Sequence, residues 1–475
     1  MTMSRSRLSC LLAALMAFAM ASAGAVKPAP KATAKPPVAA SAPQSADAEC
    51  NDDASARPAA AVSATASTAS ALEAAESDPR TQLQTLVRQA LARSKQIGTA
   101  RLLKLAAEAD VDEAKAEQHL PSLFFTGTSG HVGTIISGIT TTKGILNRGA
   151  ITAAMPLFDF GHLAKLTEWR QQLSEAARYS QSGAEEQVAL QTVSLALDRS
   201  RYSLQAQVYN QYVRRMSCLV AALTIITEAD RGRASELVQA QKSLQQAKLS
   251  VDQTESVLRQ TEVRLKFFVG DQLPPPAGMS TVLSALPDLA QAEADVSLAA
   301  DVASADAQAR AARSYAESVK AGQMPSVSVQ VSADTSLGAA RQTDWSGGIA
   351  VTVPLLQPGA DAALTSAVRR AQAASLQRDD AIETKRYRVR EMHESAASTF
   401  DRAKLIVDIL RNSERVRAST LQQWQQLGRR SLFDVMAAEG DYYSMRVAHV
   451  NALFDAEQIV ALIWSQGRGV MVPLR

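Results

Sequence analysis

The chain has 475 residues, of which 46% are hydrophobic, 20% are charged and only 5% are aromatic. Large compact cores take much of their burial from aromatic side chains, so this composition argues against a large globular enzyme. The formal net charge is only +3, and no basic block is dense enough to favour nucleic-acid binding. A chain rich in Ala, Gln, Glu, Lys, Arg and Leu is typical of long helices packed side by side.

Residues 1–25 have the pattern of a secretory signal peptide. Arg5 and Arg7 precede an apolar stretch, and the small residues of 21–25 offer a cleavage site. The apolar stretch is far shorter than the roughly 20 residues that a membrane helix needs. We therefore expect the mature protein to be exported, and expect no helix of the chain to anchor it in a membrane.

Residues 26–78 are dominated by Ala, Pro, Ser and Thr. Such a segment cannot bury enough apolar area to fold, so the sequence predicts a disordered tail. Two cysteines remain after the signal, Cys50 in this tail and Cys218 in a helical segment. A disulfide between them and two free thiols are both compatible with an oxidising compartment.

The chain contains an internal repeat. Three landmarks recur in the same order about 200 residues later. They are HLPS (119–122) with QMPS (323–326), AAMPLFDFG (153–161) with VTVPLLQPG (351–359), and RGRAS (231–235) with GRRS (428–431). We therefore predict a first structural repeat over 79–268, a linker over 269–285 and a second repeat over 286–475.

Each repeat carries two stretches with a hydrophobic period of two, which indicates strands with one apolar and one polar face. In the second repeat, Val327, Val329 and Val331 alternate with Ser326, Ser328 and Gln330. Gly-, Thr- and Ser-rich segments, about 134–148 and 336–345, are expected to be loops. The predicted strands are about 121–133, 149–158, 325–335 and 346–355, and strands of ~9–11 residues can cross a bilayer when tilted.

Long helices with a seven-residue repeat follow the strands. Strict sevens indicate coiled-coil packing against neighbouring helices. At ~1.5 Å per residue each such helix is on the order of 100 Å long. A second helix follows each glycine turn, over roughly 236–267 and 432–465. The repeating positions are Val188, Leu195, Tyr202, Tyr209, Met216 and Leu223 in the first repeat, and Ile382, Val389, Ala396, Ala403 and Leu410 in the second.

Four amphipathic strands cannot close a barrel alone, and open strand edges are not tolerated in lipid. The strands therefore either form a sheet in water or are pooled by several chains. Single-chain bacterial barrels start at about eight strands, and three copies of this chain would supply about twelve.

The order of helix, two strands, very long helix, glycine turn and return helix resembles the TolC-type outer-membrane efflux protein family. The residues that carry the resemblance are Pro121 and Pro325 at strand starts, Pro156 and Pro354 at strand ends, and the turn segment 427–453. The resemblance implies an α+β fold of internally duplicated coiled-coil helices with two transmembrane β-hairpins. It further implies a homotrimer with a 12-strand barrel in the outer membrane and a helical tunnel in the periplasm.

In that family the glycine turns lie at the periplasmic tip of the tunnel, which places Gly232 and Gly428 there. Alignment on Gly428 puts Arg430 and Asp434 at positions that resemble gate residues. Three carboxylates, one per chain, would attract cations and repel one another where the tip narrows. The spacing from Ser431 to Asp434 also fits a helix capping box, and the two roles are compatible.

The sequence departs from the family at the second gate position. The second aspartate of the family is Ala437 here, and the first repeat has Val238 where Asp434 would recur. The charged ring is then thinner, or Glu439 takes over.

No catalytic site is expected. The five histidines are scattered, and no HExxH, Cys/His zinc spacing, Walker loop or GxSxG pattern is present. We predict a protein that is not an enzyme, with no catalytic residues, no cofactor and no metal.

The predicted function is that of a passive exit duct, the outer-membrane channel of a type I secretion system for a large RTX- or cyclolysin-like toxin or adhesin. The resemblance implies partners in an inner-membrane ABC transporter and a periplasmic membrane fusion adaptor, with outer-membrane lipid around the barrel and no nucleic acid. An alternative is the outer-membrane component of a multidrug or small-molecule efflux pump. A different class is a periplasmic coiled-coil adaptor, which should carry a lipoyl-like or barrel domain of its own.

Overall fold

The structure is a computed structural model that describes residues 78–136, 139–275, 278–338, 341–427 and 430–474. The predicted signal peptide at 1–25, nearly all of the predicted tail at 26–78, Cys50 and Gly428 lie outside the described residues. Cys218, in the long helix that follows the first pair of strands, is part of a disulfide.

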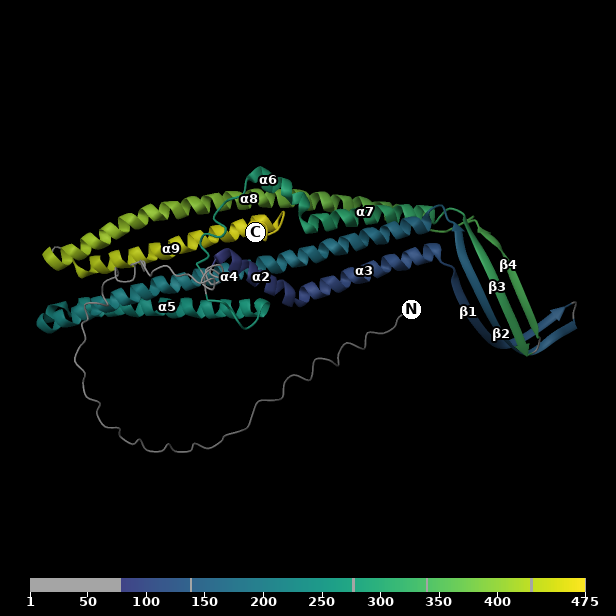
Figure 1. Ribbon diagram of the computed structural model, residues 1–475, viewed down its shortest axis with the longest axis horizontal. Helices are drawn as coiled ribbons and strands as arrows, with labels where there is room; N and C mark the ends of the chain where they lie inside the picture. Colours follow the sequence, from purple (N-terminus) through teal and green to yellow (C-terminus); the bar gives the residue numbers. More distant parts are fainter. Residues whose placement is uncertain (1–77, 137–138, 276–277, 339–340, 428–429, 475) are drawn as a thin grey trace, which may run out of the picture. The chain divides into compact units, whose positions relative to one another are not determined.

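The same order of elements occurs twice along the chain (Figure 1). The first set is α2 (Pro79–Arg93), α3 (Lys95–His119), β1 (Ser122–Ile136), β2 (Ile139–Phe158), α4 (His162–Ala229), η2 (Arg231–Arg233) and α5 (Ala234–Val269). The second set is α6 (Leu289–Asp295), η3 (Val296–Leu298), α7 (Ala300–Ala321), β3 (Ser326–Gly338), β4 (Gln342–Thr352), α8 (Ala360–Gln422), η4 (Gln423–Leu427) and α9 (Leu432–Ser465). The domain bounds of 79–268 and 286–475 stay a prediction.

The two long helices are α4, with 68 residues, and α8, with 63. At ~1.5 Å per residue, α4 is about 100 Å long. The predicted heptads are confirmed by burial, because Val188, Met216 and Leu223 of α4 and Val389 and Ala396 of α8 are all fully buried. These residues pack on α5, α7 and α9, which run beside the long helices (Figure 1).

The largest apolar cluster lies where α2, α4, α5, α9 and the C-terminal turn meet. Leu86 of α2, Leu197 of α4, Leu265 of α5, Phe454 of α9 and Leu474 of the terminal turn are all at most 2% exposed there. A second cluster joins the far ends of α4 and α8 to the starts of α5 and α9. The helices thus have cores of their own within one chain.

All four strands form one antiparallel sheet in the order β1-β2-β3-β4. The two predicted hairpins are therefore not isolated from each other, because β2 pairs with β3 from Leu146↔Gly338 to Phe158↔Val327. This pairing joins segments almost 200 residues apart in the chain, which no local pattern could reveal.

The strands extend further than predicted. Much of the first predicted loop, 134–148, lies in strand, since β1 runs to Ile136 and β2 begins at Ile139. Most of the second predicted loop, 336–345, also lies in strand, since β3 runs to Gly338 and β4 begins at Gln342. The physical reason is that β-branched Thr and Ile residues favour strand conformation even where glycines intervene.

Candidate functional site

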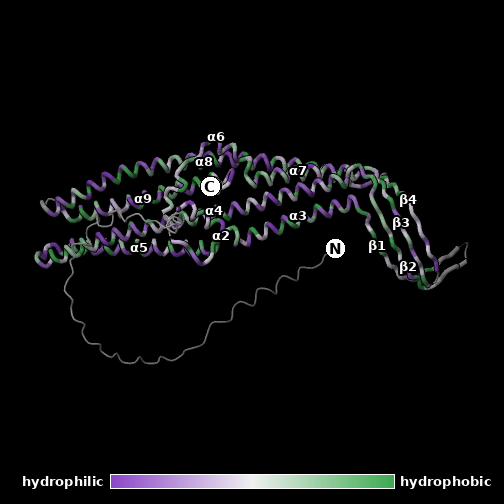
Figure 2. The backbone as a smooth tube through the Cα atoms, in the orientation of Figure 1, coloured by the Kyte–Doolittle hydropathy of each residue, from purple (hydrophilic) through white to green (hydrophobic). Residues whose placement is uncertain are grey.

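The sheet has one apolar and one polar face. Leu123, Ala153, Val331 and Gly347 are aligned across the four strands, and this register places the odd-numbered residues of the paired strands on a common face. Large apolar side chains on that face are open in the single chain: Trp345 is 84% exposed and Phe125 is 74% exposed. Figure 2 shows hydrophobic residues along the strands. An apolar surface of this kind marks an interface with lipid or protein.

The even-numbered face is mostly polar, with Phe124 of β1 (59% exposed) as an apolar exception. An ion pair joins Arg148 of β2 to Asp334 of β3, with 2.9 Å between Nη2 and Oδ2. Ser332 and Ser346 share a hydrogen bond of 2.8 Å across β3 and β4. The predicted alternation of period two is therefore confirmed, because the structure separates the apolar and polar residues onto opposite faces.

The sheet has two open edges. Among the described residues, β1 pairs only with β2 and β4 pairs only with β3. An unpaired edge offers a row of backbone donors and acceptors to another strand.

Each long helix starts at a glycine with left-handed backbone. Gly161 (φ 84°) precedes α4 and Gly359 (φ 89°) precedes α8, at equivalent places in the two halves. Before α4, the carboxylate of Asp159 accepts hydrogen bonds from the backbone N–H groups of Gly161 (3.0 Å) and Leu163 (2.7 Å). These contacts fix the direction in which the chain leaves the sheet.

Apolar side chains are open at these junctions. Leu355 and Leu356, between β4 and α8, are 92% and 86% exposed. The equivalent residues Leu157 and Phe158 of β2 are 52% and 54% exposed. The junctions therefore extend the apolar surface of the sheet toward the helices.

None of the helices in the described part of the chain is both long and apolar enough to cross a lipid bilayer.

The predicted gate residues Arg430 and Asp434 lie near each other at the start of α9. The Nη1 of Arg430 is 3.9 Å from Oδ2 of Asp434, and about half of each side chain is open to solvent. The predicted capping box is confirmed: the Ser431 hydroxyl accepts from the Asp434 N–H, and the Asp434 carboxylate accepts from the Ser431 N–H. Gly232 lies in η2, the turn between α4 and α5, where its N–H donates to the Asp230 carboxylate (2.9 Å).

The alternative that Glu439 replaces a missing gate aspartate is wrong for this conformation. Glu439 is fully buried, and its carboxylate is 3.0 Å from Nε of Arg215 in α4 and 3.6 Å from Nη1 of Arg417 in α8. A carboxylate that is buried between helices and paired with two guanidinium groups is not accessible to an ion in the tunnel. Ala437 and Val238, the other two positions, are exposed and uncharged.

Sequence reasoning missed the cluster around Glu439. Arg417 lies over the ring of Tyr442 at 4.3 Å, and the rings of Tyr212 and Tyr443 are 5.0 Å apart. The cluster joins α4, α8 and α9 close to the end of α8 and the start of α9. The residues are far apart in sequence and reach one another from three helices, so no local pattern of the sequence could reveal the cluster.

The described residues hold no group of three or more His, Cys, Asp or Glu side chains that could bind a metal ion. His162 Nδ1 contacts the Ser318 carbonyl oxygen at 2.8 Å, and His393 Nε2 contacts that of Pro287 at 3.2 Å. These two histidines join helices to their neighbours. That the protein is not an enzyme stays a prediction.

No family model matches the chain, and no curated protein matches it. Solved structures do share its fold, and 22 chains match. CusC, whose crystal structures describe folding and transmembrane channel formation, superposes with a TM-score of 0.72 and 18% identity, covering 82% of this chain and 92% of CusC. The outer-membrane protein VceC of Vibrio cholerae gives 0.71 and 17%, covering 82% and 97%. The open state of the Neisseria gonorrhoeae outer-membrane channel MtrE gives 0.69 and 17%, covering 82% and 90%.

At 17–18% identity these likenesses concern the fold. Over 82% of its length the chain has the fold of these outer-membrane channels, which confirms the TolC-like fold of the single chain that the sequence predicts. The adaptor alternative predicted a separate lipoyl-like or barrel domain, whereas β1–β4 form one sheet on the long helices.

Proposed function

We propose that three copies of this chain form a passive exit duct in the bacterial outer membrane. The observation that carries the proposal is the four-stranded sheet with an open apolar face and two open edges. If β4 of each copy pairs with β1 of the next, the backbone groups of the two edges are satisfied along the length that the strands share. The apolar faces then meet lipid and the polar faces line a water-filled lumen, as transmembrane barrels require.

The helices support the same assembly. Exposed apolar side chains continue along α8 and α5 of the single chain, away from its own cores. They include Leu376, Tyr387 and Leu405 of α8, which are 60–68% exposed, and Val263 and Phe267 of α5, which are 67% and 78% exposed. Coiled-coil faces of this kind bury themselves against a neighbouring helix. Neighbouring copies would therefore continue the sheet as a helical tunnel on the periplasmic side.

The tip of the tunnel would act as a gate. In a trimer, Asp434 of each chain contributes one carboxylate to a ring around the axis. Arg430, whose guanidinium lies 3.9 Å from this carboxylate, offsets part of its negative charge. Because Ala437 is uncharged and Glu439 is buried, this single ring carries the selectivity for cations at the entrance.

The duct has no energy source of its own in this proposal. Its cargo is therefore set by the inner-membrane partner that docks on it. We assign it to type I secretion, with an ABC transporter, a membrane fusion adaptor and an RTX-like toxin or adhesin as passenger. Small-molecule efflux is the competing role for the same duct.

Mass measurement of the detergent-solubilised protein tests the assembly. We expect three copies per particle, and cation-conducting pores in planar bilayers. Two copies would give an eight-strand barrel and would contradict the trimer. A monomer without conductance would overturn the duct altogether.

The cargo is tested in the host cell. Deletion of the gene should abolish export of the protein passenger and leave the accumulation of small dyes unchanged. Restored export by the wild-type gene is the control. Unchanged export with raised dye accumulation would assign the duct to efflux instead.

A further inference from the structure

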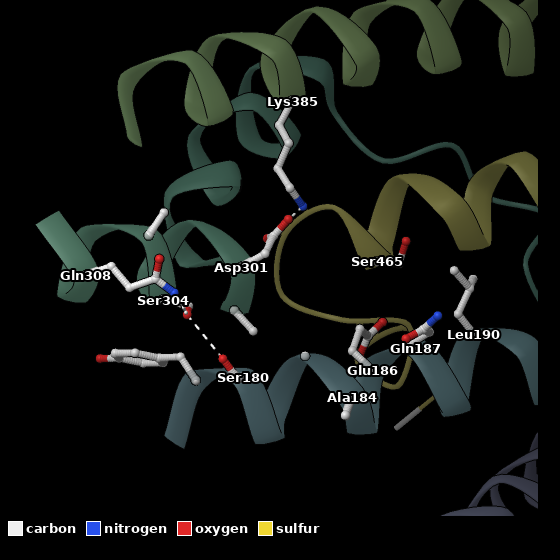
Figure 3. A pocket seen from close by; sticks show the side chains of 14 residues that line it. Ser180, Ala184, Glu186, Gln187, Leu190, Asp301, Ser304, Gln308, Lys385 and Ser465 are labelled. Carbon is white, nitrogen blue, oxygen red and sulfur yellow. Dashed lines mark hydrogen bonds and ion pairs between the residues drawn. The ribbon is translucent and has the colours of Figure 1, made fainter. Parts of the chain in front are cut away.

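A cavity of about 640 Å³ lies where α9 ends and α7 begins, with α4 along one side (Figure 3). Its walls come from α4 and α7, with Lys385 from α8 and Ser465 from α9. The volume falls within the range of ligand pockets, roughly 300–1,000 Å³. No part of the proposed duct uses this cavity.

Glu186 of α4 brings a half-buried carboxylate to the cavity. Its Oε1 accepts a 2.6 Å hydrogen bond from the N–H of Val470 in the C-terminal turn. Oε2 has no hydrogen-bond partner among the described residues. Burial raises the pKa of Glu186, and this effect exceeds the opposing effects of the Val470 hydrogen bond and the Lys385 charge. One oxygen of this group is thus left for a ligand.

The only other charged groups of the cavity neutralise each other. Lys385 Nζ lies 2.9 Å from Oδ1 of Asp301, at the start of α7, and the Lys385 side chain is only 15% exposed. Figure 3 shows this pair on the opposite wall from Glu186. The net charge of the side chains that line the cavity is therefore one negative charge, and the carboxylate without an ion-pair partner is that of Glu186.

The remaining lining combines apolar and polar surface. Ala184 and Leu190 of α4 and Ala300 of α7 are apolar, and Tyr179 adds an aromatic ring. Ser180 and Ser304 share a hydrogen bond of 3.2 Å, so their hydroxyls are already partnered (Figure 3). An organic body would therefore meet mostly apolar wall, with a cationic end near Glu186.

We propose that this cavity binds an organic cation, an amine or quaternary ammonium group carried on an apolar body. A bare metal ion is a poorer fit, because Glu186 and Asp301 are the only acidic side chains of the lining and Asp301 already holds Lys385. The proposal does not depend on the trimer or on the cargo of the duct.

Glu186 also has a structural role, and the test must distinguish loss of this role from loss of ligand binding. Gly469 (φ +102°) passes so close that an added Cβ would lie 2.6 Å from Oε2. The carboxylate thus fixes the C-terminal turn on α4. The substitution Glu186→Gln keeps the Oε1 acceptor for Val470 and replaces the unpartnered Oε2 with an uncharged NH2 group, so it removes the charge and the free acceptor together.

The experiment titrates the full-length protein in detergent with dansylcadaverine, a fluorescent primary amine with an aromatic body. We expect saturable binding that weakens at least tenfold in Glu186→Gln. The control Glu185→Gln removes the same charge from the preceding residue of α4, which does not line the cavity, and should change the affinity less than twofold. Equal binding by the parent and Glu186→Gln would overturn the proposal.

A second variant keeps the test decisive if Glu186→Gln misfolds. Lys385→Met removes the cation that neutralises Asp301, so the cavity becomes more negative and the affinity for dansylcadaverine should rise severalfold. Dansylglycine carries the same fluorophore with a negative charge and should not compete. Weaker amine binding in Lys385→Met, or competition by dansylglycine, would contradict a cation site.

Discussion

The sheet and the helical bundle differ in how far their apolar side chains are buried within a single chain. In the bundle, Val389 and Met216 are 0% exposed within a single chain, and even a carboxylate, Glu439, is enclosed with its partners. In the sheet, Val331 at the middle of β3 is 51% exposed and Trp345 of β4 is 84% exposed. The bundle therefore has apolar cores within one chain, although α5 and α8 also expose apolar side chains, whereas the apolar face of the sheet needs surroundings that the single chain does not supply.

The largest effect is expected on the apolar face of the sheet. Val331→Arg places a charge on the apolar face, and Gln330→Arg places the same charge on the adjacent residue of the polar face. A charge on a lipid-facing strand costs about 2–4 kcal/mol per chain near the bilayer centre. We expect Val331→Arg to abolish membrane insertion and Gln330→Arg to leave it intact, as measured by the share of protein in urea-washed outer membranes.

Equal insertion of these two variants would mean that the apolar face does not meet lipid. The sheet would then have to be covered by protein, and the contrast between the two regions would disappear.

The second prediction concerns the bundle. Arg215→Met leaves the buried Glu439 with Arg417 alone, at 3.6 Å. Removing one partner of a buried ion pair lowers the free energy of unfolding by about 3–5 kcal/mol. Because Arg417 still neutralises Glu439, we expect a loss near the lower of these values. The double variant Arg215→Met/Glu439→Met should recover part of the loss, because no buried carboxylate remains. Thermal unfolding of the wild type, Arg215→Met, Glu439→Met and the double variant measures the coupling, and additive losses would show that the two side chains act independently.

The third prediction uses pH. Glu457 of α9 is 1% exposed, and burial raises its pKa to about 8, above the ordinary 4.5. The folded state therefore keeps a proton that the unfolded state releases between pH 4.5 and 8, so stability should fall as pH rises through this window. From pH 5 to pH 7 the loss is about 2–3 kcal/mol. Glu457→Gln should flatten this dependence in unfolding experiments, and an unchanged slope would exclude Glu457 as its source.

The smallest expected effect separates capping from gating at the tip. Ser431→Ala removes the cap of α9 and keeps the charge, so it should cost about 1 kcal/mol and leave conductance unchanged. Asp434→Asn keeps a hydrogen-bond acceptor and removes the charge, so it should lower cation selectivity in planar bilayers. Unaltered selectivity in Asp434→Asn would remove Asp434 from the gate.

The predictability of the two regions also differs. Helix spans and their buried face could be predicted because a heptad repeat is a local pattern, and Val188 and Ala396 are buried as expected. The two faces of the strands could be predicted for the same reason. The pairing of β2 with β3 could not, since it is a contact between distant segments that depends on how both hairpins dock on the helices.

The candidate site was predicted less completely than the fold. The capping box at Ser431 and Asp434 has a three-residue spacing that a sequence displays directly. The burial of Glu439 depends on Arg215 and Arg417, which reach it from two other helices. The cavity at Glu186 depends on where α7 starts against α4, and the backbone of Val470 has no sequence signature as a donor.

The open edges of β1 and β4 limit how long an unassembled chain can safely exist. Each edge will accept any free strand, including the same edge of another incomplete chain, and such contacts lead to aggregates. Correct closure needs several copies to meet, so its rate rises more steeply with concentration than that of a one-to-one encounter. Overproduction should therefore favour inclusion bodies, and slow expression at low temperature should favour closed particles.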